Sequence, residues 1–169
     1  MKVLGIDPGT MVMGYGVIES EDDEIALIDF GALVVPERSA IGERLSYLYN
    51  ELIKIIECHQ PDAVVVEQPF ISKNVRSAMA IGRAQAVALL AAAERGIPTY
   101  EYTPAQIKQR VANYVASSKE QIQEMVRLQL RLSEIPQPDD AADALAVAIC
   151  HLREIHLSNL LAGQQRERK

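Results

Sequence analysis

The stretch KVLGIDPGTMVMGYGVIE, residues 2–19, decides the start of the fold, because two apolar runs flank one tight turn. Residues 2–7 and 13–19 have the apolar content and turn boundaries typical of strands, and Pro8–Thr10 supplies the turn between them. The first strand ends in an acid, Asp7. A strand built for burial therefore places a carboxylate directly before a chain reversal.

The next segment, EIALIDFGALVV at residues 24–35, follows an acidic turn and predicts a third strand. Three consecutive strands at hairpin spacing indicate an antiparallel meander. Within the second strand, Gly14 and Gly16 have no side chain, so another backbone can come close there.

The rest of the chain alternates between helix and strand. Apolar spacing predicts helices over residues 41–59, 75–95, 105–114, 119–132 and 140–156, and strands over residues 62–67 and 98–103. This pattern predicts an α/β fold with a mixed five-stranded sheet flanked by helices. One domain is expected over residues 1–157, followed by a disordered tail at 158–169.

Composition limits the classes of protein to which the chain can belong. Of 169 residues, 49% are hydrophobic, which excludes a disordered chain, and no apolar run is long enough to cross a membrane. The two cysteines are isolated, which favours a reducing, cytoplasmic location over disulfides or zinc. The net charge is −6, yet residues 72–133 carry nine Lys and Arg against four Asp and Glu. Such a basic island marks either a surface that faces a polyanion or an ordinary solvated helix face.

Carboxylates recur at three places where a structural role alone explains them incompletely. Asp7 could cap its turn, and Glu67 could mark where a buried strand reaches the surface. In PQPDDAADALAVA, Asp139 or Asp140 could cap the helix. Asp143 lies one turn further on among Ala, Leu and Val, without Lys or Arg three or four residues away. A buried carboxylate needs a partner, and several without local cations favour Mg²⁺ or Mn²⁺.

The order of the motifs GIDPG, GYGV, VVVEQPF and DDAADALAVAICH resembles the RuvC family of bacterial Holliday-junction resolvases, in the ribonuclease H-like superfamily. The resemblance runs from Met1 to about His151. It implies a homodimeric, structure-specific endonuclease that resolves four-way DNA junctions by paired symmetric nicks, in recombination and DNA repair. It further implies two Mg²⁺ ions per subunit, for which Mn²⁺ can substitute, and a branch-migration helicase complex of the RuvA and RuvB type as partner.

The resemblance also assigns residues. The family's four acidic metal ligands fall on Asp7, Glu67, Asp140 and Asp143, whereas helical spacing alone could not choose Asp140 over Asp139. The resemblance places DNA contacts at Phe70, Lys108 and Lys119, and Lys119 is also expected to aid catalysis through its charge. Arg76 is a further candidate from its position on the predicted helix at 75–95, where it could reach either a phosphate or the other subunit.

One stretch departs from the family pattern. Where the family commonly has Gly-x-Gly, this chain has Asn113 and Val115 within ANYVASSK. Asn tolerates a positive φ moderately and Val does not, so the shape and base preference of this loop are expected to differ.

Other interpretations stay open at this point. DPGTMVMGYG also resembles the phosphate hairpin of the ATP-binding actin and sugar-kinase group, although that group needs two such halves. A nuclease for structured RNA and a junction-binding protein that does not cut are further alternatives. The helix at 75–95 is apolar on more than one face, so it is either fully internal or paired with a twin across Ala78, Gly82 and Ala86.

Overall fold

The computed structural model describes residues 1–21, 24–68 and 75–167, with side chains described as far as Ala162. The strands are β1 (Lys2–Asp7), β2 (Val12–Glu21), β3 (Glu24–Val34), β4 (Ala63–Glu67) and β5 (Thr99–Tyr102). The helices are α1 (Ile41–His59), α2 (Val75–Glu94), α3 (Pro104–Ala112), α4 (Lys119–Gln129) and α5 (Asp139–Glu167).

The five strands form one mixed sheet in the order β3-β2-β1-β4-β5. The first three strands are an antiparallel meander, while β4 runs parallel to β1 and β5 runs parallel to β4. The expected sheet is therefore confirmed, and its order makes β1 and β4 direct neighbours at the centre.

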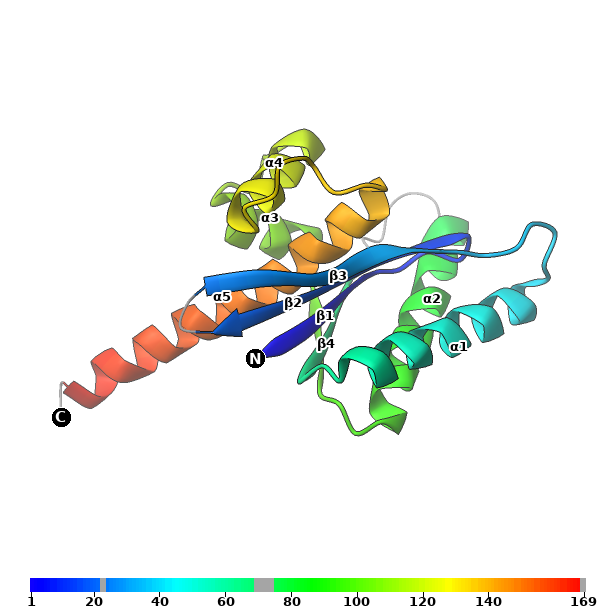
Figure 1. The fold of residues 1–169 in the computed structure, drawn as a ribbon, viewed down its shortest axis with the longest axis horizontal. Coiled ribbons are helices and arrows are strands. Elements are labelled where there is room, and N and C mark those ends of the chain that lie inside the picture. Colours follow the sequence, from blue (N-terminus) through cyan, green and yellow to red (C-terminus); the bar gives the residue numbers. More distant parts are fainter. Residues whose placement is uncertain (22–23, 69–74, 168–169) are drawn as a thin grey trace.

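Helices cover the two faces of the sheet unequally (Figure 1). On one face α1 and α2 pack against every second residue of the central strands, such as Leu4, Ile6 and Val64. On the other face the first half of α5 packs against the intervening residues Val3 and Val65, and α3 and α4 pack against α5. Because successive side chains of a strand point to opposite faces, the single sheet has a separate hydrophobic core on each side.

Helix α5 approaches the sheet more closely than side chains would normally permit. A Cβ added to Gly5 would overlap the carbonyl oxygen of Ala144, and one added to Gly14 would overlap that of Asp140. The α5 residues that face the strands are small or buried, and Ala144 and Ala148 are fully enclosed. The expectation that Gly14 allows close backbone approach is confirmed, and the approaching element is α5.

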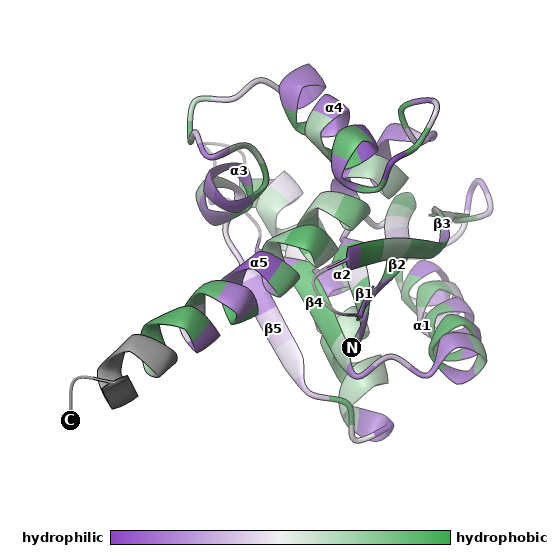
Figure 2. Cartoon of the chain, turned by 60° about the vertical axis from the view of Figure 1, so that its left-hand side comes forward, coloured by the Kyte–Doolittle hydropathy of each residue, from purple (hydrophilic) through white to green (hydrophobic). Residues whose placement is uncertain are grey.

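The last helix differs from the sequence-based expectation. It was expected to end near His156, with a disordered tail from residue 158, whereas α5 continues to Glu167. In Figure 2 its first half lies against the sheet and its second half extends away from the body of the molecule, so local helical preference rather than core packing forms that part. Within the described ranges, no helix is both long and apolar enough to cross a membrane.

Candidate active site at the acidic edge of the sheet

The two strand-borne acids end neighbouring strands on the same face of the sheet. Asp7 is the last residue of β1, and Glu67 is the last residue of β4. The parallel register pairs Ile6 with Val66, so the next position brings Asp7 beside Glu67. Because Ile6 and Val66 face α1 and α2, alternation turns both acids toward α5.

The start of α5 brings further acids to this edge. Asp139 and Asp140 lie in its first turn, where the helix dipole favours negative charge, and Asp143 lies one turn further on. Asp7 pairs with Gly14 across the β1–β2 ladder. Since the backbone of Asp140 rests on Gly14, the beginning of α5 lies directly over the end of β1.

Two helix caps position the lysines. The Ser118 hydroxyl accepts a hydrogen bond from the Gln121 amide, and the Gln121 side chain accepts one from the Ser118 amide, so α4 begins at Lys119. Thr103 makes the same reciprocal pair with Gln106 at the start of α3, which carries Lys108.

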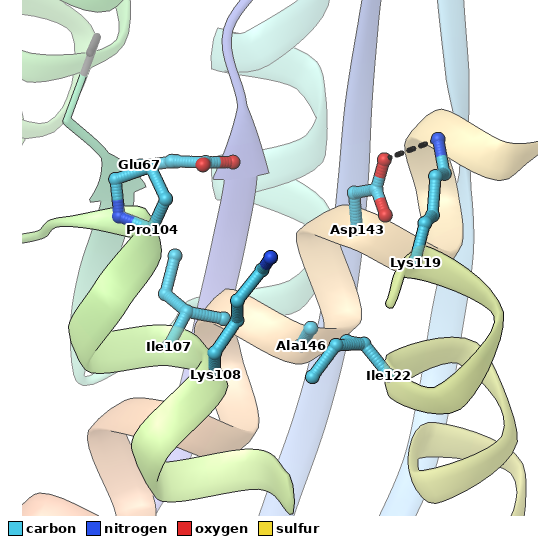
Figure 3. Close-up of a pocket in the computed structure, with 8 residues that line it drawn as sticks. All are labelled: Glu67, Pro104, Ile107, Lys108, Lys119, Ile122, Asp143 and Ala146. Carbon is cyan, nitrogen blue, oxygen red and sulfur yellow. Dashed lines mark ion pairs between the residues drawn. The ribbon is translucent and has the colours of Figure 1, made fainter. Parts of the chain in front are cut away.

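Carboxylates and lysines meet in one open pocket of about 200 Å³ (Figure 3). It is lined by Glu67, Pro104, Ile107, Lys108, Lys119, Ile122, Asp143 and Ala146. Lys119 Nζ lies 2.8 Å from Asp143 Oδ2 and 3.5 Å from Asp139 Oδ2. Figure 3 shows Glu67 on the opposite side of the pocket, with Lys108 rising between the two walls. The pocket thus combines anionic and cationic walls above an apolar floor of Ile107, Ile122 and Ala146.

The acids disfavour one another's ionised form. Burial, followed by the charges of Glu67, Asp143 and Asp140, raises the pKa of Asp7 from 3.8 to about 7. Burial and the charge of Asp143 raise the pKa of Glu67 from 4.5 to about 7. The pKa of Asp143 is also raised by burial, although its hydrogen bond from Lys119 opposes the shift. Burial is the largest cause of each shift, and the charges of neighbouring acids add to it.

The chemistry of this donor set fits hard divalent cations. Oxygen-only ligands with excess negative charge suit Mg²⁺ or Mn²⁺, and such a cation would remove the repulsion that raises these pKa values. In the part of the chain that the structure describes, however, no three Asp, Glu, His or Cys side chains converge closely enough to hold a metal ion as they stand. The acids are gathered at one edge, and coordination would require their side chains to turn.

The other residues singled out in the sequence are not among those that line this pocket. Arg76 lies exposed in the first turn of α2, and Phe70 lies outside the described residues. In the loop after α3, Asn113 takes a positive φ of 57° and ends the helix, whereas Val115 does not have a positive φ. Asn therefore supplies the one left-handed conformation that this loop requires, and the valine causes no strain.

Asp139 is the functional candidate that sequence reasoning treated as a cap or left open. In the structure its carboxylate is one of two that face Lys119. The signal available in the sequence was the four-residue spacing of Asp139 and Asp143, which puts both on one face of α5.

Comparison with known proteins gives a consistent result. The family model described as crossover junction endodeoxyribonuclease RuvC matches residues 3–151. A protein of that description from Dehalococcoides mccartyi is 58% identical over 162 residues, which cover 96% of this chain and 97% of the relative. The structure of Thermus thermophilus RuvC matches with a TM-score of 0.87 at 33% identity, covering 94% of this chain and 97% of that one. The structure of T. thermophilus RuvC in complex with Holliday junction substrate matches with a TM-score of 0.84, also at 33% identity, over 93% and 96% of the two chains.

Proposed function

This chain belongs to the RuvC family of crossover junction endodeoxyribonucleases, and from that premise we propose that it resolves four-way DNA junctions by paired symmetric nicks. The observation that carries the proposal is an open pocket in which Glu67 of β4 and Asp143 of α5 lie beside two lysines. The charges of both acids also act on Asp7 at the end of β1. Acids supply ligands for metal ions, and lysines supply charge for a phosphate.

The proposed metal ligands are Asp7, Glu67, Asp140 and Asp143, and the proposed cofactor is a pair of Mg²⁺ ions. Two such ions, when bound, would activate a water and offset charge on the leaving oxygen of the phosphodiester. The chain's own part is to hold the four acids on rigid elements: two central strand ends and the first turns of a helix that is locked to the sheet through Gly14. Burial keeps the acids from being solvated individually, which strengthens their demand for cations.

The proposed DNA contacts are Lys108, Lys119, Arg76 and Phe70. Lys108 and Lys119 border the pocket from α3 and α4, so both ammonium groups can reach a phosphate there. Lys119 lies beside Asp143 and is the proposed catalytic cation. Phosphate contacts of this kind release counterions, so binding should weaken steeply as salt rises.

A homodimer is proposed because its two-fold symmetry would match that of the junction. Each of the two strands to be cut would then face one pocket. Helix α2 supports this: Val75, Met79 and Leu90 are large apolar side chains more than half exposed on its surface. An apolar helix surface of this kind is typical of one that packs against a second copy. Roles in recombination and DNA repair and a partner complex of the RuvA and RuvB type are proposed from family membership alone. A cytoplasmic location is proposed from the two isolated cysteines.

Cleavage of a synthetic mobile four-way junction tests the proposal. The purified protein is incubated with the junction and Mg²⁺ or EDTA, and the nicks are mapped on each strand at nucleotide resolution. We expect symmetric nicks on two opposing strands with Mg²⁺ and none with EDTA. Equal cutting of linear duplex, preferential cutting of a stem-loop RNA, or binding of the junction without any nick would each overturn it.

A further inference from the structure

Lys119 is the cation that the structure places against the acids of this site. Its Nζ faces two carboxylates of one helix, Asp139 and Asp143, which lie one turn apart on the same face. Only Asp143 belongs to the proposed metal ligands. The same ammonium group therefore contacts one proposed ligand and one acid outside that set.

We propose that a divalent cation displaces Lys119 from Asp143, and that Asp139 then retains the ammonium group at the edge of the pocket. This inference rests on the proposed function, because it requires that Asp143 bind metal. Lys119 would be a placeholder for the cation in the metal-free protein, and Asp139 a positioning residue that keeps the same charge beside the pocket after metal entry.

The geometry permits the exchange without a change of fold. Lys119 Nζ is 2.8 Å from Asp143 Oδ2 and 3.5 Å from Asp139 Oδ2, so a small rotation of a flexible side chain exchanges one partner for the other. The Ser118 cap fixes the backbone of Lys119, and the lysine stem moves independently of it.

Asp143 is less exposed to solvent than Asp139, as the exchange requires. The side chain of Asp143 is 26% exposed and that of Asp139 is 55% exposed. The less exposed Asp143 carboxylate therefore gains more from a strong counter-charge. Asp139 is solvated and can accept an ammonium group or release it at little cost.

A fixed Lys119 is the competing interpretation. Carboxylates that bind metals are often held by an outer hydrogen bond, and Lys119 could play that part while the other Asp143 oxygen binds the ion. In that case removing Lys119 would disorder Asp143 and weaken metal binding, whereas displacement predicts tighter binding. The two interpretations therefore predict changes of opposite sign.

The first measurement is the affinity for Mn²⁺ alone, from the free-ion signal in electron paramagnetic resonance. Wild type is compared with Lys119→Met and with Lys108→Met, a matched control that removes a charge from the same pocket without removing an ion pair to Asp143. We expect Lys119→Met to bind Mn²⁺ roughly five-fold more tightly than wild type and Lys108→Met to change less.

Each other outcome is decisive. Unchanged or weaker binding in Lys119→Met, or an equal gain in both variants, overturns the displacement. No Mn²⁺ binding by any of the three proteins overturns the proposed metal site itself, and the inference with it.

The second measurement follows Lys119 directly by competitive acetylation and mass spectrometry, without DNA. The Lys119 amine is held between the carboxylates of Asp143 and Asp139, so it should react slowly in the metal-free protein. We expect Mg²⁺ to raise the labelling of Lys119 relative to Lys108, and to raise it further in Asp139→Asn, where the second partner is lost. A constant or falling ratio in wild type overturns the displacement, and an Asp139→Asn response equal to that of wild type overturns the role of Asp139.

Discussion

The two faces of the sheet share the same five strands and differ in how each is closed. The face under α1 and α2 is filled by large side chains such as Leu4, Ile6 and Leu52, all almost wholly buried. The face under α5 also buries large side chains such as Leu145 and Ile149, but its glycines let the helix backbone lie on the strands. Only this second face carries Asp7 and Glu67 at its edge.

The comparison teaches that both faces supply stability, whereas only the α5 face also carries the acids of the site. The face under α1 and α2 gains from burial alone, at about 25 cal/mol per Å² of apolar surface. The α5 face holds carboxylates whose pKa values are raised because their charged forms are disfavoured there. Substitutions on the two faces should therefore separate folding from function.

Asp7→Asn should give the largest effect and the sharpest separation. We expect cleavage of a four-way junction to fall by about a thousand-fold or more, because one of the four proposed metal ligands is lost. Gel shifts should retain junction binding, and in EDTA at pH 8 the variant should unfold at a higher temperature than wild type, since a disfavoured buried charge is gone. Loss of binding in a folded variant would contradict this division of roles.

Gly14→Ala tests whether the closeness of α5 positions the site. A Cβ there would overlap the carbonyl oxygen of Asp140, so α5 must shift, and we expect loss of several kcal/mol of unfolding free energy together with most cleavage. Gly42→Ala in α1 is the matched control, because a Cβ there meets nothing within 4 Å; it should stabilise by about 0.5–1 kcal/mol. Chemical denaturation and cleavage assays check both. Normal activity in Gly14→Ala would show that this contact does not position the acids.

Leu52→Ala tests the other face. Leu52 is 1% exposed in the core between α1 and the sheet, so truncation should lower the free energy of unfolding by about 2–5 kcal/mol. Cleavage per folded molecule should be unchanged at a temperature where the variant stays folded. A loss of activity as large as that of Asp7→Asn would mean that the two faces are not independent.

The pH dependence of stability gives the smallest effect. In the folded protein burial raises the pKa of Asp7 and of Glu67 to about 7, whereas their ordinary values are 3.8 and 4.5. The folded state therefore holds protons that the unfolded state has released, and stability should fall as pH rises from about 4 to about 7. Urea unfolding in EDTA should show this decline, and Mg²⁺ should reduce it at pH 8. A decline of equal size in Asp7→Asn would exclude Asp7 as a source.

Much of the fold follows from local pattern in the sequence. Alternation and turn residues predicted the meander, and helical spacing located all five helices to within a few residues, apart from the far end of α5. Beyond His156 helical spacing continues only through Leu157, Leu160 and Leu161, and the polar stretch GQQRERK after them was interpreted as a tail, although α5 continues to Glu167. The end of an exposed helix is set by the helical preference of its residues. The spacing of apolar residues, which marks packed helices, does not locate such an end.

The site was predictable in its acids and less so in its ion pairs. Asp143 stood out because an apolar helix offered it no partner, and the structure supplies one in Lys119. That Lys119 also faces Asp139 could not be read from spacing, since the two lie on different helices whose approach is set by the packing of α4 on α5. Arg76 as a DNA contact stays a prediction, as do the four acids as metal ligands.

The glycines beneath α5 have a consequence for how this scaffold can diversify. Because Gly5 and Gly14 set the separation of helix and sheet through main-chain atoms, the depth of the acidic edge is a property of the backbone and not of any side chain. Residues on α3, α4 and the loop between them can then vary the rim, and with it the choice of nucleic-acid sequence, while the spacing beneath stays constant.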